Sequence, residues 1–392
     1  MRNLNKKRLL VFTSTFPRWK DDPKPSFVFE LSKRLAKEFE VSVLAPHSPG
    51  ARRKESLGGL SVYRFKYFKE NCQKLNDFEG ILSILSHRKL LYLLVPFFIV
   101  VELIALLKYV VRNEPDLIHA HWIIPQGFIA YLNHKILKTP YVITSHGSDV
   151  MGLKGFNFVK RLTLKSAKKI TVVSNEIKRK ILHEIDSGLR IETIPMGVDT
   201  NIFSPQMKDE SLLREHNIKG PFLLFVGRIS AEKGIKYLIH AMPAVIAEYP
   251  NVKLLIIGDS DQKNELMELV KHQNLQQHVV FIGKLLNEKL PRYYATADAF
   301  ICPSFREGSP VTYIESLACG TPIVVGDLPM SREIVLENRG LLVKQNDSRD
   351  ISRKIIGLLK TKKCLEKDLH NFVKSHYDWT VITKKIQKIL AC

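Results

Sequence analysis

Residues 299–325 read AFICPSFREGSPVTYIESLACGTPIVV, and this stretch predicts a complete unit of strand, loop, helix and strand. The runs at 299–302 and 322–325 are short and apolar on both faces, which is typical of parallel strands buried between helices. Gly320 followed by Pro322 is a common signature of a helix end. The loop after the first strand is therefore expected at the strand's carboxyl end, where open α/β sheets bind ligands.

The same pattern of short apolar runs, separated by segments of helical length, recurs along the chain. The runs are residues 8–13, 41–45, 116–120, 141–144, 170–173, 222–226, 253–257, 278–282, 299–302 and 322–325. A cluster of Pro, Gly, Asp and Asn at residues 194–205 interrupts the series. Since 392 residues suffice for two domains, the sequence predicts an α/β protein that divides at this break.

The composition is that of a folded protein. With 45% hydrophobic and 25% charged residues, it excludes a disordered chain, a collagen and a coiled-coil rod. The net charge of +21 favours an anionic partner, such as nucleic acid, an acidic membrane surface or a phosphorylated substrate. Residues 1–200 hold most of the excess, with 33 Lys and Arg against 18 Asp and Glu. The anionic partner is therefore expected at the first half of the chain.

The cysteines and the first residues of the chain indicate the cellular compartment in which the protein is expected. Five cysteines are scattered without a C-x-x-C pair or a histidine at zinc spacing, which predicts neither a metal site nor a disulfide framework and fits a reducing cytosol. The apolar run after Lys6, Lys7 and Arg8 is too short for a signal peptide, and we interpret it as the first strand.

A basic segment in the first half is a candidate for membrane contact. Its five bases follow Phe156 and Phe158 and cover half of a helical wheel, which fits either a solvated helix face or a membrane surface. The bases are Lys160, Arg161, Lys165, Lys168 and Lys169.

Residues 90–107 are almost purely apolar and marginally long enough to span a bilayer. A single crossing there would put the strand at 8–13 on the opposite side of the membrane from the strands at 116–120 and 141–144, and one parallel sheet would be dismantled. We therefore expect a buried or membrane-grazing helix at this position.

The loop and helix within residues 303–320 provide two carboxylates. Glu307 lies in the loop and Glu315 in the helix, so both can face the ligand side of the sheet. The helix N-terminus between them offers free N–H groups and the positive end of a dipole to a phosphate. Glu315 suits a ribose, because a carboxylate can accept hydrogen bonds from two hydroxyls.

A second loop, with the sequence VGRISAEKG at residues 226–234, also follows a predicted strand and precedes a helix. Gly227 allows a close turn of the backbone, and Arg228 and Lys233 supply two cations. Two cations are what a diphosphate requires, although an ordinary charged surface loop could have the same composition.

In this order and spacing, the motifs resemble those of the family 4, or group 1, retaining glycosyltransferases. The matching stretches are GRISAEKG at 227–234, the E-x7-E pair with its tail ACGTPIV, the linker PMGVDTNIF at 195–203, HAHW at 119–122 and SHGSDV at 145–150. The resemblance covers nearly the whole chain. It implies the GT-B fold, in which two Rossmann-like domains with parallel sheets face each other across a cleft.

The resemblance also implies domain limits. The N-terminal acceptor domain would comprise residues 1–198 and a C-terminal helix at 376–392 that crosses back to it, near Asp378 and Trp379. Residues 199–375 would form the domain that binds the nucleotide-sugar donor.

The family pattern further implies roles for single residues. Gly227, Arg228 and Lys233 would hold the donor diphosphate, and Glu315 would hold the ribose. Glu307 and the loop at Gly308, Ser309 and Val311 would contact the transferred hexose. His146 would lie near the reacting face of the sugar. The candidate catalytic residues are thus His146, Glu307, Arg228 and Lys233.

No metal or other cofactor is expected, because two fixed cations and a helix N-terminus can stabilise the leaving diphosphate. Asp259, Ser260 and Asp261 have the D-x-D spacing of metal-dependent glycosyltransferases of the other major fold, but we interpret them as a turn. His119 and His121 are interpreted as pointing to opposite faces of one strand, which argues against a shared ion.

Two positions depart from the family pattern. The loop at 16–26 contains no glycine, although the family commonly has a Gly-Gly loop there, so acceptor contacts do not carry over. Pro310 has no N–H and cannot donate to a sugar.

We therefore expect a hexosyltransferase that moves a hexose from a nucleoside-diphosphate sugar to a glycan or lipid-linked acceptor in cell-surface polysaccharide or lipopolysaccharide biosynthesis. A sugar-nucleotide epimerase or a glycoside phosphorylase of the same fold is the alternative. A basic nucleic-acid-binding protein is a third reading, but no recognition module is visible and we expect no nucleic-acid partner. No G-x-G-x-x-G follows a predicted strand, which excludes a nicotinamide dehydrogenase.

The expected location is the cytoplasm, with peripheral contact to the inner face of the membrane through the basic N-terminal domain.

Overall fold

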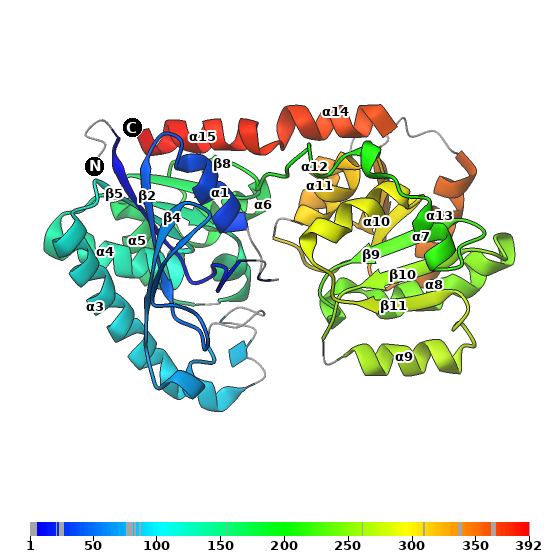
Figure 1. Ribbon diagram of the computed structural model, residues 1–392, viewed down its shortest axis with the longest axis horizontal. Coiled ribbons are helices and arrows are strands. Elements are labelled where there is room, and N and C mark those ends of the chain that lie inside the picture. Colours follow the sequence, from blue (N-terminus) through cyan, green and yellow to red (C-terminus); the bar gives the residue numbers. More distant parts are fainter. Residues whose placement is uncertain are drawn as a thin grey trace. The chain divides into compact units, whose positions relative to one another are not determined.

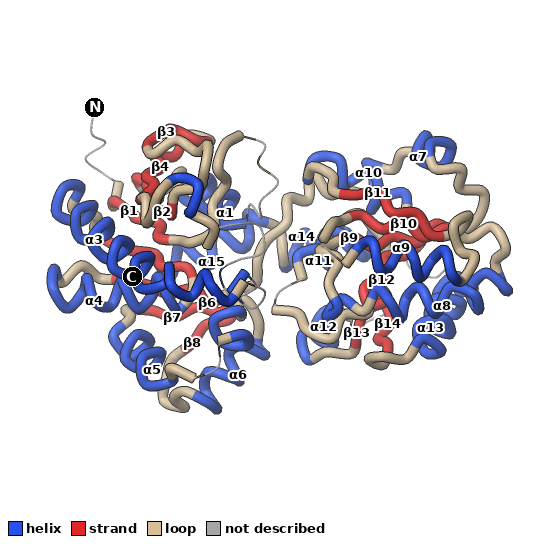
Figure 2. The backbone as a smooth tube through the Cα atoms, turned by 90° about the horizontal axis from the view of Figure 1, so that it is seen from below, coloured by secondary structure: helices blue, strands red, loops and turns tan. Residues whose placement is uncertain are grey.

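The computed structural model describes residues 6–20, 22, 27–75, 81, 84–85, 88–153, 155–260, 262–308, 310–335, 339–361 and 366–391. The chain forms two compact units (Figure 1). Unit 1 is Met1–Met196 with Ile382–Cys392, and unit 2 is Gly197–Val381. Each unit is a sheet with helices on both sides (Figure 2). The predicted α/β class, with two parallel-sheet units, is confirmed.

Unit 1 contains an eight-stranded sheet in the order β3-β4-β2-β1-β5-β6-β7-β8. The strands are β1 (Arg8–Phe12), β2 (Glu40–Pro46), β3 (Lys54–Leu57), β4 (Leu60–Phe65), β5 (Leu117–His121), β6 (Tyr141–Ser145), β7 (Lys169–Val172) and β8 (Ile191–Thr193). All neighbours are parallel except β3 and β4, which form a hairpin. Every residue of β5 and β6 is buried, including the polar His119, His121, Thr144 and Ser145.

The helices of unit 1 connect its parallel strands. They are α1 (Phe27–Leu35), α3 (Val95–Asn113), α4 (Phe128–Leu137), α5 (Asn157–Ser166) and α6 (Asn175–Glu184), with short turns η1 (Glu70–Cys72), η2 (Lys89–Leu94), η3 (Ile123–Gly127) and η4 (Ser148–Gly152). Helix α15 (Trp379–Ala391) begins in unit 2 and ends in unit 1. Lys7 Nζ donates to the carbonyl of Ala391 at 2.8 Å and holds the end of α15 beside β1.

The segment Lys89–Asn113, formed by η2 and α3, is long and apolar enough to cross a membrane by length and composition, and its most apolar 18-residue window has a mean hydropathy of 2.7. In unit 1 it packs by one face only. Phe98, Glu102 and Leu106 are buried on that face, and 17% of its most apolar window is buried.

Unit 2 contains a six-stranded parallel sheet in the order β11-β10-β9-β12-β13-β14. The strands are β9 (Phe222–Val226), β10 (Lys253–Ile257), β11 (Val279–Gly283), β12 (Ala299–Cys302), β13 (Ile323–Gly326) and β14 (Gly340–Val343). After β9 the chain builds the sheet in one direction to β11, and it then returns to place β12 on the other side of β9. The carboxyl ends of β9 and β12 thus form a topological switch point, where doubly wound sheets bind ligands.

The helices of unit 2 are α7 (Ser211–Glu215), α8 (Ile235–Glu248), α9 (Lys263–His272), α10 (Leu290–Thr296), α11 (Val311–Ala318), α12 (Pro329–Ile334), α13 (Ser348–Thr361) and α14 (Glu366–His376), with short turns η5 (Pro205–Met207), η6 (Ala231–Lys233) and η7 (Asn287–Lys289). The apolar faces of α8 and α13 pack together against the sheet, and all residues of β9, β12 and β13 are buried.

The linker motif pairs with the start of α15 inside unit 2. Val198 N donates to Tyr377 O at 2.9 Å, and Trp379 N donates to Val198 O at 3.0 Å. Thr200 Oγ1 donates to the Asp378 carboxylate at 2.6 Å. A Cβ at Gly197 would lie 2.6 Å from the Trp379 ring, so only glycine lets the chain pass so closely.

Candidate functional site

The loops after β9 and β10 touch through two glycines. Gly227 follows β9 with a φ of +155°, and Gly258 follows β10 with a φ of +150°. A Cβ at Gly258 would lie 1.9 Å from the carbonyl oxygen of Gly227. The first turn of the GRISAEKG loop is therefore fixed by backbone contact that any side chain at residue 258 would prevent.

The GRISAEKG loop is also fixed against the loop after β12. Gly234 has a φ of +69°, and a Cβ there would lie 2.3 Å from Pro303 O. Phe305 N donates to Glu232 O at 2.7 Å. The two loops that contain the predicted donor-binding residues thus form one rigid structure at the switch point.

Lys233 and Glu307 are 74 residues apart in the sequence, and the structure brings them together. Lys233 Nζ donates to Glu307 Oε1 at 2.6 Å, and the two side chains are 19% and 8% exposed. Burial alone would lower the pKa of Lys233, but the Glu307 carboxylate outweighs it and the pKa is raised. Lys233 is therefore a fixed cation at the carboxyl ends of β9 and β12.

Arg228 lies on the same loop. Its Nη2 donates to Glu232 Oε1 at 3.0 Å, and both side chains are more exposed than the Lys233 pair, at 39% and 40%. Each of the two predicted phosphate-binding cations is thus matched by a carboxylate. An incoming diphosphate would compete with Glu232 and Glu307 for these cations.

Glu315 lies inside α11, partly exposed. Tyr294 Oη donates to its Oε2 at 3.0 Å, and Tyr294 is itself fully buried. Burial raises the pKa of Glu315 to about 7, although the bond from Tyr294 acts in the opposite direction. One carboxylate oxygen is thus held by Tyr294, and the other can accept a hydroxyl.

The start of α11 completes this group in unit 2. Pro310 is the N-cap residue and provides no side-chain cap, so the amides of the first turn, at Val311 and Thr312, are suited to an anion. Gly308 precedes this turn, whereas Ser309 lies outside the described residues. Gly227, Arg228, Lys233, Glu307, Gly308, Val311 and Glu315 all belong to unit 2.

His146 belongs to unit 1 and follows β6. Its Nε2 lies 2.9 Å from His121 Nδ1, and the two rings stack with centroids 5.2 Å apart. The rings of Trp122 and Phe27 also pack on His146, at 4.8 and 4.9 Å. His146 is therefore held in an aromatic environment at the carboxyl end of the sheet.

The histidines of unit 1 form one cluster, and the prediction that His119 and His121 point to opposite faces is wrong. Their ring centroids are 4.3 Å apart, because side chains two residues apart on a strand point to the same face. His119 Nε2 lies 2.7 Å from Thr144 Oγ1, which in turn lies 2.7 Å from Thr171 Oγ1. Both histidines are 1% exposed and form part of the core.

The histidine cluster is uncharged near neutral pH. Burial lowers the pKa of His146 to about 3 and that of His119 to about 4. Burial, together with the neighbouring rings, also lowers the pKa of His121. No group of three potential metal ligands occurs among the residues that the structure describes. The cluster can therefore donate and accept hydrogen bonds as neutral imidazoles.

Asp149 is a positioning residue to which the sequence analysis gave no role. Its carboxylate accepts from Ile123 N at 2.6 Å, Ser145 Oγ at 2.8 Å and Gly147 N at 3.1 Å. Burial raises the pKa of Asp149 while these donors oppose the shift. The residue joins the loop after β5 to the loop after β6 and so fixes the backbone beside His146. In the sequence, the position of Asp149 two residues after Gly147 was the feature that could have indicated this role.

Of the five bases at residues 160–169, Arg161, Lys165 and Lys168 are exposed, whereas Lys160 is buried. Lys160 is 2% exposed and donates to Leu153 O at 2.6 Å. Arg161 and Lys165 both pair with Asp186, at 2.7 and 3.1 Å. The exposed bases of α5 thus fit the predicted solvated helix face, with part of their charge neutralised by Asp186.

Asp259 and Ser260 lie in an irregular segment after β10. Asp259 Oδ1 accepts from Ser260 N at 3.1 Å, and Ser260 Oγ donates to Ile229 O. Asp261 lies outside the described residues.

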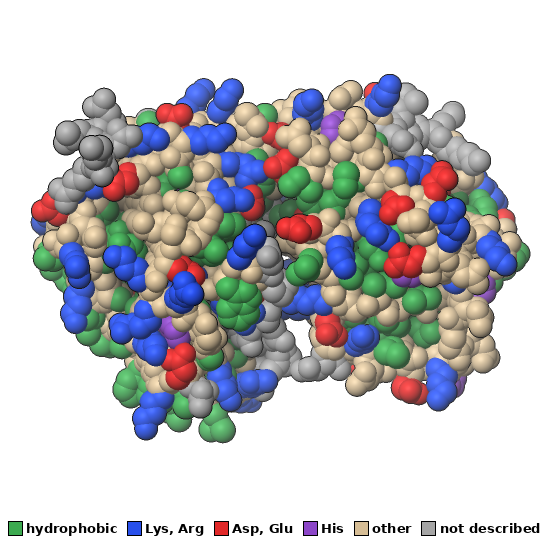
Figure 3. All heavy atoms as spheres, viewed as in Figure 1, with side chains coloured by type: hydrophobic (Ala, Val, Ile, Leu, Met, Phe, Trp, Pro, Cys, Tyr) green, Lys and Arg blue, Asp and Glu red, His purple; other side chains and the backbone are tan. Residues whose placement is uncertain are grey.

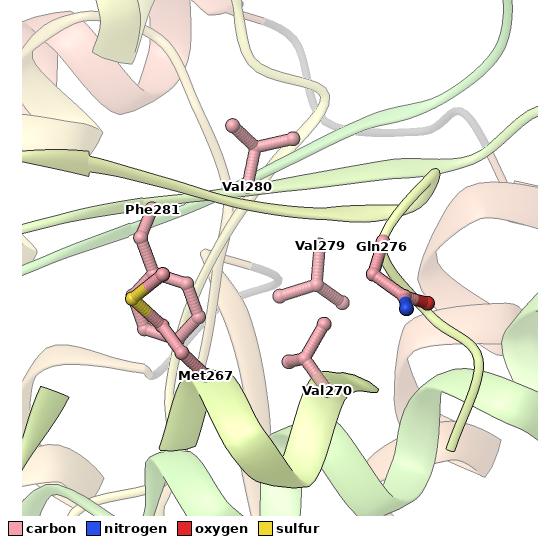
Figure 4. A pocket seen from close by; sticks show the side chains of 6 residues that line it. All are labelled: Met267, Val270, Gln276, Val279, Val280 and Phe281. Atoms are coloured by element: carbon pink, nitrogen blue, oxygen red, sulfur yellow. The ribbon is translucent and has the colours of Figure 1, made fainter. Parts of the chain in front are cut away.

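An apolar hollow lies in unit 2 between α9 and the edge strand β11 (Figure 4). It is lined by Met267, Val270, Gln276, Val279, Val280 and Phe281. Because it contains no charged side chain, it does not suit a diphosphate.

Two family models match the chain. The model described as "Glycosyl transferases group 1" matches residues 209–390, and the model "Glycosyltransferase Family 4" matches residues 26–202. An uncharacterized glycosyltransferase, MJ1178 of Methanocaldococcus jannaschii, is 28% identical over 72% of this chain and 77% of its own length. The putative teichuronic acid biosynthesis glycosyltransferase TuaC of Bacillus subtilis is 28% identical over 64% of each chain.

Solved structures share the whole fold. Sucrose-phosphate synthase of Thermosynechococcus elongatus matches with a TM-score of 0.81 and 20% identity, over 98% of both chains. HepE of Anabaena, solved in complex with UDP-glucose, matches with a TM-score of 0.72 and 17% identity, over 98% of this chain and 99% of that one. At these identities the likeness shows the arrangement of the backbone, and it leaves the ligands to be argued from the residues.

Proposed function

The chain belongs to the group 1 glycosyltransferases of the GT-B fold, and we propose that it moves a hexose, with retention, from a nucleoside-diphosphate sugar to a glycan or lipid-linked acceptor in cell-surface polysaccharide or lipopolysaccharide biosynthesis. The observation that carries the proposal is the Lys233–Glu307 pair beside Arg228 at the switch point of unit 2. The likeness to TuaC supports a surface polysaccharide, and the likeness to HepE supports a nucleotide-sugar donor.

The reaction breaks the bond between the sugar and the diphosphate, so negative charge grows on the leaving group. Arg228, Lys233 and the first amides of α11 would bind that charge. When Lys233 turns to the phosphate, Glu307 loses its 2.6 Å partner, and its carboxylate is left to accept a hexose hydroxyl. The same pair would thus orient the sugar and stabilise the departing diphosphate.

Glu315 would accept the ribose hydroxyls of the donor, with Tyr294 fixing the orientation of its carboxylate. His146, of unit 1, would hydrogen-bond the transferred hexose as a neutral imidazole. We assign this contact from the family pattern and from the fixed position of the ring between His121, Trp122 and Phe27.

We propose that no divalent metal ion takes part, because side-chain cations occupy the place where a metal ion would neutralise phosphate. Turnover should therefore be unchanged by EDTA. A loss of activity that Mn²⁺ or Mg²⁺ restores would contradict this part of the proposal.

We also propose that the enzyme acts in the cytoplasm, at the inner face of the membrane. The described cysteines Cys72, Cys302 and Cys319 are free thiols, which is typical of a reducing compartment.

The test begins with a thermal-shift screen against UDP-, GDP- and ADP-sugars. A donor at 100 times its dissociation constant should add about 2.7 kcal/mol to the free energy of unfolding. Turnover is then measured as nucleoside diphosphate release, which should require an acceptor. Conversion of the donor without an acceptor, or release that depends on phosphate, would indicate the epimerase or the phosphorylase instead.

A further inference from the structure

The segment Lys89–Asn113 lies on the surface of unit 1 with its inner face firmly packed. Phe98 contacts the rings of Phe65 and Tyr67, at 5.8 and 5.0 Å. Tyr109 Oη donates to Ser42 Oγ on β2 at 2.6 Å. These contacts fix which face of α3 points inward.

The outward face of the same helix is apolar. Its residues are Leu93 (72% exposed), Phe97 (55%), Val100 (55%), Ile104 (44%) and Val111 (67%). They are spaced by four, three, four and seven positions, so they form one stripe along the helix. A surface helix normally exposes polar residues on this side, and a continuous exposed apolar surface usually marks an interaction site.

The apolar surface extends beyond this η2–α3 stripe. Leu90 and Tyr92 of η2 are 84% and 56% exposed. Phe68, after β4, is 38% exposed and packs its ring on Phe97 with centroids 5.7 Å apart. In Figure 3, hydrophobic side chains lie along the lower left margin, where Figure 1 draws α3, and Lys and Arg side chains lie among them.

Within Lys89–Asn113 the exposed charges have one sign, and the exposed Glu114 that follows the segment pairs with Arg8 at 3.7 Å. Arg88 and Lys89 are exposed at its start, and Lys108 and Arg112 are exposed near its end. The only acidic residue of Lys89–Asn113 is Glu102, which is fully buried and accepts from Gln126 Nε2 at 2.9 Å. Apolar side chains between basic ends match an anionic bilayer, where acyl chains lie between layers of phosphate.

The alternatives fit less well. The inner face is committed to the packing of unit 1, so the helix would lie along a bilayer and would not cross it. Two copies of the stripe in a symmetric pair would bring bases together without an acid on the exposed face to match them. The bases of α5 are partly neutralised, because Lys160 is buried and the exposed Arg161 and Lys165 both pair with Asp186.

We propose that the η2–α3 stripe lies in the interface of an anionic lipid bilayer, with its apolar side chains among the acyl chains and its four bases at the headgroup phosphates. This inference rests on the proposed function, because it would place the enzyme where a lipid-linked acceptor resides.

The experiment measures binding of the full chain to vesicles of phosphatidylcholine, with and without phosphatidylglycerol. The variant Leu93→Gln/Phe97→Gln/Val100→Gln should lower the affinity at least tenfold, or about 1.4 kcal/mol. The matched control is Ile136→Gln/Phe158→Gln, at exposed apolar positions on α4 and α5. It should bind as the parent does.

A charge variant separates the two contributions. Lys89→Glu/Lys108→Glu should lose the preference for phosphatidylglycerol and its salt sensitivity, while the remaining affinity for phosphatidylcholine persists. Equal binding by the triple variant and the parent would overturn the proposal. So would loss of binding in the control alone, which would move the contact to α4 or α5.

Sedimentation velocity without lipid tests whether a second copy of the chain covers the stripe instead. A dimer that the triple variant dissociates would assign the stripe to a second copy of the chain. If the triple variant does not fold, as judged by thermal unfolding, Val100→Trp provides the readout. Its fluorescence should be quenched by brominated acyl chains, and the absence of quenching would overturn the proposal.

Donor binding distinguishes a failure of this inference from a failure of the proposed function. The triple variant should keep the parent's thermal shift with the donor, since Arg228 and Lys233 lie in unit 2. Vesicle binding without any donor shift in the parent would overturn the proposed function alone.

Discussion

The candidate functional residues of the two units differ in charge. In unit 2, two cations face two carboxylates, as Arg228 with Glu232 and Lys233 with Glu307. In unit 1, His119 and His121 are buried and His146 is half-buried, and all three have lowered pKa values and carry no charge near neutrality. The difference teaches where the proposed reaction develops its negative charge: fixed ions are needed at the leaving diphosphate, whereas neutral rings suffice to orient hydroxyls.

The largest effect is expected from Lys233→Ala. The variant removes the most buried cation of the site and leaves Glu307 without its partner, so kcat/KM should fall about 10²- to 10³-fold, or about 3–4 kcal/mol of transition-state stabilisation. Arg228→Ala should act in the same direction. The matched control is Lys360→Ala, because Lys360 forms an ion pair with Glu248 on the helices α13 and α8. Unchanged turnover in both site variants would remove the charged group of unit 2 from the reaction.

The next effect concerns Glu315, where function and stability should change in opposite directions. The folded protein binds a proton at Glu315 up to a pKa of about 7, against an ordinary value of 4.5. Ionised Glu315 therefore lowers the free energy of unfolding, and this penalty grows as the pH rises from 4.5 to 7. Glu315→Gln should weaken donor binding but raise stability at pH 8, by up to about 3 kcal/mol.

The measurement is urea unfolding of the parent and Glu315→Gln at pH 5 and pH 8. The gain should be present at pH 8 and mostly absent at pH 5. An equal gain at both pH values would show that the Glu315 carboxyl does not have the raised pKa. Donor affinity unchanged in the variant would rule out its contact with the ribose.

A smaller effect, on the free energy of unfolding, is expected from substitution of Asp149 in unit 1. Asp149→Asn replaces one accepting oxygen by an amide donor, so one of the buried donors at Ile123, Ser145 or Gly147 loses its partner. The free energy of unfolding should fall by about 1–3 kcal/mol. Asp327→Asn, in an exposed pair with Arg332, is the control and should change it by less than about 1 kcal/mol. Chemical denaturation of both variants decides the point, and equal losses would contradict the positioning role.

The smallest effect tests the neutrality of His146. His146→Gln keeps a hydrogen-bonding group, so kcat/KM should fall only about tenfold, roughly one hydrogen bond. The pKa of His146 is about 3, so the shape of the pH–rate profile between pH 5 and 8 should be the same in parent and variant. A limb near pH 6.5 that disappears in His146→Gln would show that the ring titrates during the reaction.

Much of the fold was predictable because buried parallel strands leave continuous apolar runs in the sequence. The strands β3, β4, β8 and β14 were missed. Of these, β3, β8 and β14 have three or four residues and lie at sheet edges, where one side lacks a partner strand. The hairpin of β3 and β4 turns at Gly58 and Gly59, both with positive φ, and this glycine pair was the available signal.

The candidate site was predictable as a set of residues but not as a set of contacts. Motif spacing indicates Arg228, Lys233 and Glu307, yet only the strand order places Glu307 beside Lys233. Conversely, a helical wheel counts the bases of α5 but does not show that Lys160 bonds inward. The roles proposed for these residues in binding and catalysis remain predictions for the variants above.

The buried Glu102 on α3 contributes to the rotational register of that helix, together with its buried apolar neighbours. Burial raises the pKa of Glu102 to about 8, so the group is mostly a neutral acid at physiological pH and needs no counter-ion in the core. A roll of α3 by half a turn would exchange this acid for Ile104 and would break its bond from Gln126. This polar contact thus adds to the packing of Phe98 and Tyr109 in keeping the apolar side of the helix turned outward.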